Sequence, residues 1–599
     1  MNLSTLDYSI IFVFFAVTLI IGIVVSKKSS KNTDEYFLSG RNMPWWLLGF
    51  SMVATTFAAD TPLYVADVVR QNGVSGNWEW WTFLITGMLT VFVYAKLWRK
   101  SNVKTDIEFY ELRYGGKTAK FLRGFRAIYL GLVFNVLVMS AVMLAAIKIG
   151  GIMLGLTPFQ VVGYAGLVTV IFSAIGGFRG VVYTDFLLFI VAMIGAIAAA
   201  YYAVNLPEVG GLTKLFQNEA VISKMDILPD FNNTELIMTL LVIPLAVQWW
   251  SAWYPGAEPG GGGYIAQRML AAKDEKNAIG ATFFFNIMHY AMRPWPWILV
   301  ALASIVVFPD LESIQAAFPS IEAGKLGHDY AYPAMLTFLP KGLLGLVLAS
   351  LIAAFMSTIS THLNWGSSYI VNDFYKRFVK PEASEKEQVL VGRLSTVVLI
   401  VLSSILALGF TNANQVFHTI IAFGAGTGLL FILRWFWWRI NSWSEISAMI
   451  SSGIVSLTFS LYEKSLFGDA NMFPSWSKFP LIVLITTIIW VTVTYLTKPE
   501  KQEVLENFYF KIQPSKIGWR SIINKAKDNG NNIVDDTVNS SLTYGIIAML
   551  ISTILVYSIL FAIGNYIYGE TTLAFILFGT ATICAFILIK LWDKIKEGF

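Results

Sequence analysis

The chain has 599 residues, of which 56% are hydrophobic and 14% charged, and its mean hydropathy is +0.62. It carries roughly twice the apolar excess and about half the charge of a soluble protein, so a cytosolic globular protein is excluded. The net charge of +5 is what Lys and Arg in cytoplasmic loops produce, and it does not indicate nucleic-acid binding. One cysteine, Cys584, and four histidines exclude a disulfide framework and a Cys- or His-rich metal centre.

Fifteen apolar stretches are long enough to be membrane spans, since about 20 apolar residues cross the roughly 30 Å of hydrocarbon. The first is not a cleavable signal peptide, because Lys27, Lys28 and Lys31 follow it and no small-residue cleavage site closes it. The stretches lie near residues 8–26, 45–69, 80–98, 125–155, 158–176, 182–204, 236–256, 278–308, 333–371, 391–410, 415–438, 445–462, 479–497, 542–564 and 571–591.

The basic residues predict the orientation, because cytoplasmic loops of membrane proteins are enriched in Lys and Arg. Alternate loops are basic, including 96–126 and 376–393, whereas 206–235 and 308–331 are acidic or neutral. We therefore expect an integral protein of the plasma (inner) membrane with its N-terminus outside and its C-terminus in the cytoplasm. The polar stretch 498–540 is predicted to be a cytoplasmic linker rather than a domain.

Span two is interrupted at its middle by polar residues and proline. The segment holds Thr55, Thr56, Asp60, Thr61 and Pro62. Proline removes a backbone donor and clashes with the preceding turn, and an aspartate cannot face lipid. The pattern favours an unwound helix facing a hydrated cavity, with a kinked structural helix as the alternative.

Span seven is interrupted in the same way, because two prolines and five glycines surround Glu258. Interrupted hydrophobic segments at corresponding positions of two halves indicate an inverted-repeat transporter with its site at the midplane. Spans two and seven are five apart, which predicts two five-helix repeats in spans two to six and seven to eleven. The expected regions are 1–40 (leader helix and loop), 41–440 (transport core, with repeats 41–205 and 236–440) and 441–599 (accessory helices).

Two further polar features lie at membrane depth. Span nine carries hydroxyls at Ser357, Thr358, Ser360 and Thr361. Oxygen ligands suit a small hard cation such as Na⁺, but Ser and Thr also pack membrane helices together, and the pattern leaves both readings open. Asp185 follows Arg179 just inside span six, where the residues alone favour an interfacial ion pair over an ion ligand.

Several segments together resemble the sodium:solute symporter family, which contains the sodium/glucose, sodium/proline and sodium/sialic acid transporters. The resemblance covers about residues 8–440 and is carried by FLSGRNMPWWLLGFSMVATTFAA, EFYELRYG, IGGFRGVVYTD, YIAQRMLAAKDEKNA and AAFMSTISTHLNWGSSYIVNDFYK. It implies an all-α, LeuT-like fold of two inverted five-helix repeats, with one leader helix and about four extra C-terminal helices. Core helices 1 to 10 then correspond to spans two to eleven.

The resemblance also implies sodium ligands. The site shared by the family lies between core helices 1 and 8 and would use the carbonyls of Ala54, Phe57 and Ala354 and the hydroxyls of Ser357 and Thr358. Thr358 replaces the commoner Ser but keeps the oxygen. A second site, held by some members, would use Asp185, Ser357, Ser360 and Thr361, and this makes Asp185 an expected ion ligand.

Solute candidates follow from the same resemblance. The segment NWEWWTF is similar to one that contacts the sugar in sugar carriers, which assigns Glu79 and Thr82, and Thr56, Asp60 and Thr61 fall on the corresponding positions of core helix 1. A carboxylate that accepts bonds from vicinal hydroxyls beside a tryptophan face is suitable chemistry for a sugar. The second break is longer and richer in glycine than the family pattern, so its candidates rest on no residue correspondence: Gln248, Trp250, Trp253, Tyr254 and Glu258.

His289 and Arg293 lie at membrane depth in span eight, where sugar carriers usually show a lysine. An arginine there can pair with Glu258 or bind a substrate carboxylate. A neutral sugar and an acidic sugar, carboxylate or amino acid therefore both stay open. The tryptophans at 45, 46, 435 and 437 are expected in an interfacial belt.

The resulting hypothesis is a sodium-coupled symporter that imports a small polar solute, foremost a sugar or sugar derivative, by alternating access. Its expected partners are Na⁺, the solute and membrane lipid. A sodium-responsive sensor on the same scaffold is the alternative from another class. A membrane enzyme is not expected, because Cys584 has no nearby His in the sequence and no metal-ligand spacing occurs.

Overall fold

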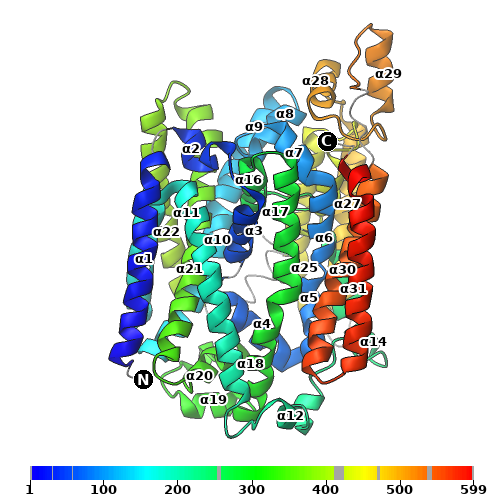
Figure 1. Ribbon diagram of the computed structural model, residues 1–599. Helices are drawn as coiled ribbons and strands as arrows, with labels where there is room; N and C mark the ends of the chain where they lie inside the picture. Colours follow the sequence, from blue (N-terminus) through cyan, green and yellow to red (C-terminus); the bar gives the residue numbers. More distant parts are fainter. Residues whose placement is uncertain are drawn as a thin grey trace.

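The computed structural model describes residues 3–29, 32–56, 58–251, 258–410, 424–467, 473–535 and 542–596. These residues form helices joined by loops and no strand, and one isolated backbone bridge joins Met43 to Ala272. Figure 1 shows the helices standing side by side in one bundle, with the N-terminus at one end and the C-terminus at the other. An odd number of membrane crossings places the termini in this way.

Eleven helical segments of the described chain are long and apolar enough to cross a membrane. Predicted spans 45–69, 158–176 and 236–256 fall on interrupted or shorter helices, and span 415–438 begins outside the described residues. The eleven segments are Thr5–Val25, Val74–Ser101, Gly116–Leu154, Gly177–Val204, Glu275–Val307, Leu343–Val379, Glu385–Gly409, Ser442–Leu461, Ser475–Leu496, Leu542–Ile567 and Thr571–Ile595.

Core helix 1 is broken where the sequence predicts. Helix α3 (Trp45–Thr56) ends four residues before α4 (Asp60–Asn72) begins, so a continuous kinked helix is not formed. Pro62 lies in the first turn of α4, where a missing backbone donor costs nothing because the first donors of a helix have no partner inside it. The proline therefore starts the second half-helix.

Core helix 6 is broken as well. It consists of α14 (Thr234–Ile237), the π-helical turn η6 (Met238–Val242), α15 (Ile243–Ala246), the short turn η7 (Gln248–Trp250) and α16 (Gly263–Ala271). Before α16 the chain takes positive φ at Gly260 (88°) and Gly261 (85°). Only glycine adopts this backbone without strain, which explains the glycine run at the break.

The other core helices contain wide π-helical turns at related places. Core helices 2 and 7 carry η3 (Thr90–Tyr94) and η8 (Met288–Met292), and core helices 3 and 8 carry η5 (Tyr129–Phe134) and η11 (Tyr369–Val379). Members of each pair are five helices apart, as a five-helix repeat requires. The flanking helices are η2 (Val74–Asn77), α5 (Trp78–Trp81), α6 (Leu84–Leu89), α7 (Ala95–Ser101), α9 (Gly116–Ile128), α10 (Asn135–Leu154), α17 (Glu275–Ile287), α18 (Pro294–Val307), α21 (Leu343–Ser368) and α22 (Glu385–Gly409).

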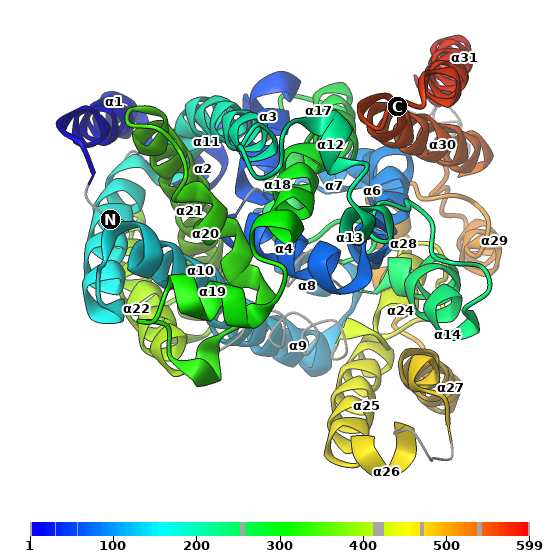
Figure 2. The same ribbon diagram turned by 90° about the horizontal axis from the view of Figure 1, so that it is seen from below.

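Core helices 4 and 5 are the two halves of α11 (Pro158–Val204), which turns sharply at Gly177 (φ 56°, ψ −167°). Helix α11 packs against α21, and the leader helix α1 (Thr5–Ser29) packs against both. Figure 2 shows α1 at the edge of the bundle beside these two helices. The leader helix therefore lies outside the core rather than within it.

The accessory helices form two separate hairpins. Helices α25 (Ser442–Leu461) and α27 (Lys478–Leu496) pack together, as do α30 (Leu542–Ile567) and α31 (Thr571–Lys596). Figure 2 shows the hairpins on different sides of the core. Helix α30 contacts core helices 2 and 7 through α6 and η8.

The predicted linker folds onto one end of the bundle. Helix α28 (Gln502–Ile512) packs against α7 and α8 (Phe109–Arg113), and α29 (Arg520–Asp528) packs against α28. Figure 1 shows both helices at the end of the bundle where the C-terminus lies. The guanidinium carbon of Arg113 lies 5.2 Å from the ring centre of Phe508 and 5.0 Å from that of Trp519. These contacts anchor the segment to the core.

The interfacial prediction is wrong for Trp435. Its side chain is 1% exposed, and its backbone carbonyl accepts a hydrogen bond from the indole of Trp519 (3.0 Å). Trp45 and Trp46 are exposed by 45% and 42%, as an interfacial belt requires. Trp435 differs because the docked linker covers it, which only the tertiary structure brings about.

Candidate functional site

The candidate site is built around the end of α3. The last four carbonyls of a helix have no partner inside the helix. Arg293, at the start of α18, donates from its guanidinium to the carbonyls of Val53 (3.0 Å) and Thr56 (2.8 Å). A helix C-terminus carries partial negative charge, so a buried guanidinium stabilises it. Arg293 thus provides donors for two of the four terminal carbonyls.

Helix α21 packs against α3 and reaches the carbonyl of Thr55. The hydroxyl of Thr358 donates to the carbonyl of Thr55 (2.7 Å) and keeps lone pairs with which it can ligate a cation. Ala354 and Ser357 are buried on the same stretch of α21. The predicted ligands thus lie on two packed helices, whereas Phe57 lies outside the described residues.

Asp185 lies in the second half of α11 and is fully buried. Its carboxylate accepts hydrogen bonds from Ser51 (2.5 Å) and Ser357 (2.6 Å). The predicted interfacial pair with Arg179 is not formed, because Arg179 reaches Glu35 instead (3.1 Å). Asp185 is therefore a core residue that connects α11 with α3 and α21.

The charge that faces Asp185 is Arg268 of α16, 3.5 Å away. Arg268 also donates to the hydroxyls of Thr55 (3.0 Å) and Thr361 (2.8 Å). Ser360, the remaining residue of the predicted second sodium site, donates to a carbonyl of its own helix. Sequence reasoning missed Arg268, although a charged residue within a short, otherwise apolar segment of the core is a signal for it.

The predicted solute residues of core helix 2 face the two broken helices. The carboxylate of Glu79 accepts a hydrogen bond from the hydroxyl of Tyr64 on α4 (3.1 Å). The side-chain amide of Gln248 donates to the backbone carbonyl of Glu79 (2.7 Å). The Thr82 hydroxyl donates to the carbonyl of Pro244 (2.8 Å). Glu79, Thr82 and Gln248 therefore come together beside both breaks.

Asp60 begins α4, directly across the break from the end of α3. One carboxylate oxygen, Oδ1, is buried with no hydrogen-bond partner among the described residues. Buried polar atoms are nearly always paired, so an orphaned oxygen is typical of a surface prepared for a ligand. Thr56 bonds to carbonyls of its own helix and Thr61 is half-buried on α4.

His289 and Arg293 have different surroundings although they lie one turn apart. The His289 ring lies among aromatic rings, with its centre 5.7 Å from that of Trp80 and 5.2 Å from that of Phe285. Trp80 follows Glu79, so His289 borders the solute candidates. Arg293 instead binds the end of α3, and it does not pair with Glu258.

Glu258 forms a buried ion pair with Arg126 of α9. The two side chains are 3% and 5% exposed. The guanidinium carbon of Arg126 also lies 5.2 Å from the ring centre of Phe431 on α24 (Gly428–Leu433). Glu258 is thus a structural contact of the second break. The ring centre of Trp250 lies 5.7 Å from that of Trp249, with the two rings tilted by 48°. The candidates Trp253 and Tyr254 lie outside the described residues.

A cavity of about 40 Å³ lies between core helices 2 and 7 and the second break. It has room for a few waters. Glu258, a predicted solute candidate, lines this cavity. Its polar lining also includes five residues that the sequence did not indicate: Thr86, Thr90, Thr282, Asn286 and Tyr290. The signal is their spacing: on each helix the residues recur every four positions and so share one face.

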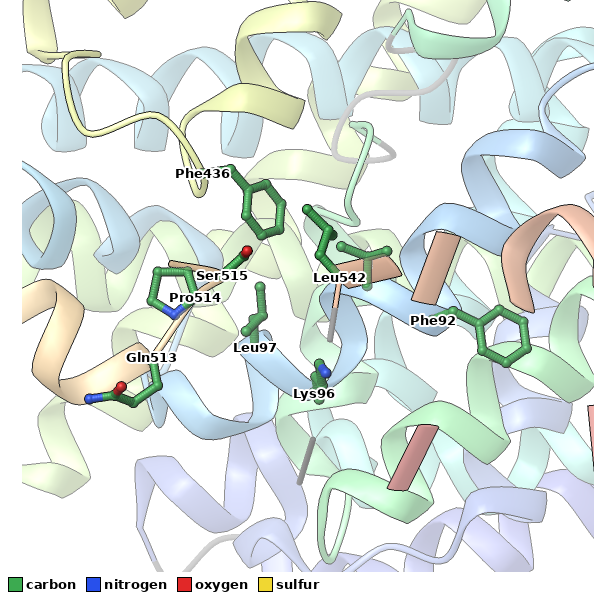
Figure 3. Close-up of a pocket in the computed structure, with 9 residues that line it drawn as sticks. Phe92, Lys96, Leu97, Phe436, Gln513, Pro514, Ser515 and Leu542 are labelled. Atoms are coloured by element: carbon green, nitrogen blue, oxygen red, sulfur yellow. The ribbon is translucent and has the colours of Figure 1, made fainter. Parts of the chain in front are cut away.

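A second, smaller hollow of about 20 Å³ lies where the linker meets core helix 2 (Figure 3). Phe92, Lys96 and Leu97 line it from core helix 2, and Pro514 and Ser515 from the linker. The volume corresponds to about one water molecule. This hollow is therefore a packing gap under the docked linker rather than a solute site.

Two broken helices that face each other in an all-helical membrane bundle define a transporter of the inverted-repeat class. A sequence profile of the sodium:solute symporter family matches residues 36–452. The chain belongs to this family and is a sodium-coupled solute transporter of the membrane. The segments that carry the resemblance, from FLSGRNMPWW to the hydroxyls of α21, lie within the matched region.

Relatives and structures of similar sequence and fold agree with this assignment. The chain is 26% identical to a sodium/glucose cotransporter of Vibrio parahaemolyticus, over 77% of this chain and 86% of that protein. It is 27% identical to a sodium/mannose cotransporter of Bos taurus, over 76% and 79%. A Na⁺-coupled sialic acid symporter in a substrate-bound, outward-open state superposes with a TM-score of 0.64 at 21% identity, over 84% and 99%. The fold is LeuT-like.

Proposed function

We propose that this protein imports a sugar or sugar derivative together with sodium. The observation that carries the proposal is the meeting of Glu79, Thr82 and Gln248 beside both helix breaks. A carboxylate, a hydroxyl and an amide provide acceptors and donors for a polyol, and Trp80 provides an apolar face. The names of the sodium/glucose and sodium/mannose relatives support the same class of solute.

We assign sodium to the carbonyl end of α3 and the facing hydroxyls of α21, with Ala54, Phe57, Ala354, Ser357 and Thr358 as ligands. Sodium entering from outside would join the two helices and stabilise the outward-open state, and solute would fill the space beside the breaks. Closure and inward opening then release both. Coupling requires that both favour the same conformations, with a coupling free energy of about 1–3 kcal/mol.

The position of Arg293 supports a neutral solute over an acidic one. A buried arginine is the expected partner of a substrate carboxylate. Here the guanidinium is engaged by the carbonyls of Val53 and Thr56, so binding a carboxylate would weaken the cap on α3. We therefore propose a neutral sugar as the first candidate solute, and acidic sugars, carboxylates and amino acids as the second.

Replacing Glu79 by Gln is expected to raise the KM for the sugar about 10- to 100-fold, because hydrogen bonds to a charged group contribute about 1.5–3 kcal/mol. The measurement is uptake of a radiolabelled panel of sugars and organic acids into proteoliposomes across a sodium gradient. The control is Glu312→Gln on the exposed loop helix α19 (Leu311–Ala317), which should leave KM unchanged. Uptake of acids alone would replace the sugar by the second candidate, and binding without flux would indicate a sensor.

The proposed orientation places the α19 loop outside and the linker in the cytoplasm of the cell. In a Cys584→Ala background, Glu312→Cys should react with a membrane-impermeant maleimide added to intact cells. Lys516→Cys, which is exposed on the linker, should react only after the membrane is opened. The reverse labelling pattern would invert the topology.

A further inference from the structure

Arg268 occupies a polar centre enclosed by the core. Its side chain is fully buried, and its Nε donates to the hydroxyl of Ser51 (3.0 Å). Its Nη2 donates to the hydroxyls of Thr55 (3.0 Å) and Thr361 (2.8 Å). Arg268 therefore binds oxygens of α3 and α21 from α16, a half of the second broken helix.

The same centre contains one buried negative charge, that of Asp185. Ser51 and Ser357 donate to its two carboxylate oxygens, and Arg268 lies 3.5 Å from Oδ2. A buried carboxylate without a counter-charge is very unfavourable, and removing one member of a buried ion pair is costly for this reason. In this structure Arg268 is the charge that balances Asp185.

The oxygens that Arg268 engages overlap with those assigned to a second sodium. Asp185 and Thr361 belong to both sets, and Ser357 is bonded to Asp185. A guanidinium and a sodium ion each carry one positive charge and bind oxygen, so they compete for the same position. Arg268 lies on α16, which contacts both α3 and α21, so a movement of α16 relative to these helices would move Arg268 toward Asp185 or away from it.

We propose that Arg268 is an exchangeable counter-cation: it neutralises Asp185 when the carrier holds no sodium, and sodium bound at Asp185 displaces it. The inference rests on the proposed sodium symport and deepens it. A symporter must return empty after releasing sodium and solute. With Arg268 paired to Asp185, the empty carrier returns without an uncompensated buried carboxylate.

The test compares net uptake with exchange in proteoliposomes. Net uptake requires the empty carrier to return, whereas exchange of labelled for unlabelled solute, with sodium on both sides, does not. Arg268→Gln should lower net uptake about tenfold or more while exchange persists, and the sodium concentration that half-saturates exchange should fall because the competing cation is gone. Sodium binding to the solubilised variant, measured by calorimetry, should tighten in the same way.

Two variants separate this role from a structural one. Arg268→Lys keeps the charge and should restore part of net uptake. The double variant Asp185→Asn with Arg268→Gln lacks both charges. Its empty carrier should return faster than that of Arg268→Gln alone, which gives a higher net uptake. The control is Arg179→Gln, whose ion pair with Glu35 does not involve Asp185 and which should change neither flux.

Equal loss of net uptake and exchange in folded Arg268→Gln, or unchanged sodium affinity, would overturn the proposal and leave Arg268 a structural residue. If Arg268→Gln does not fold, the double variant carries the test. With both charges removed, its ratio of net uptake to exchange should equal that of the wild type, and a ratio that stays low contradicts the counter-charge role. Absence of any sodium-driven flux in the wild-type protein would instead contradict the proposed function itself.

Discussion

Replacing Ser357 and Thr358 together by alanine is expected to abolish sodium-dependent uptake while folding and insertion persist. The change removes the two hydroxyl oxygens of α21 that we assign to the sodium site at the end of α3. Oxygen ligands to a charged group contribute about 1.5–3 kcal/mol each, so losing two should weaken sodium binding about 100-fold or more. The structural loss is limited, because the bond from Thr358 to the Thr55 carbonyl belongs to a class that averages about 0.6 kcal/mol, and Asp185 keeps the Ser51 donor when Ser357 is replaced.

The measurement is initial uptake against sodium concentration in proteoliposomes, together with sodium binding to the solubilised protein. The matched control is Ser367→Ala with Ser368→Ala on the same helix. Both of these hydroxyls are buried and donate to carbonyls of their own helix, at 3.0 and 2.7 Å, so their loss should not alter sodium dependence. Unchanged sodium dependence in the Ser357 and Thr358 variant would remove the assigned site.

Breaking the ion pair between Arg126 and Glu258 is expected to destabilise the protein by about 3–5 kcal/mol, because the remaining charge stays buried without a partner. Arg126→Met and Glu258→Gln should each lower the free energy of unfolding in mild detergent. The double variant should recover much of that loss, giving a coupling energy of about 3 kcal/mol. Unfolding is followed by titration with a denaturing detergent.

This experiment also decides what Glu258 does. As a structural residue, Glu258→Gln changes stability and leaves the KM of the folded protein for its solute nearly unchanged. A raised KM with unaltered stability would make Glu258 a solute ligand after all. The control pair is Lys380 and Glu387, whose side chains are 54% and 29% exposed, and Lys380→Met should leave the free energy of unfolding nearly unchanged because solvent screens the pair.

Local physical chemistry predicts the breaks in the helices well. Pro62 and the glycines before α16 have backbone requirements that no neighbouring helix can change, so α3 ends and α4 begins where the sequence indicates. The run of hydroxyl residues on α21 can likewise be recognised in the sequence. The burial of Trp435 and the docking of the linker could not be predicted from the sequence, because both depend on how distant segments pack against each other.

The sequence by itself determined the class of molecule: an apolar chain with few charges, two interrupted spans five apart, and oxygen-bearing residues where a small cation binds. Only the tertiary structure decided which charges face each other. It joined Asp185 to Arg268 rather than Arg179, Glu258 to Arg126, and Arg293 to the carbonyls of α3. The physical reason is that hydropathy and backbone preference act within one segment, whereas a buried charge is stabilised by whichever partner the packing of distant helices brings within a few ångströms.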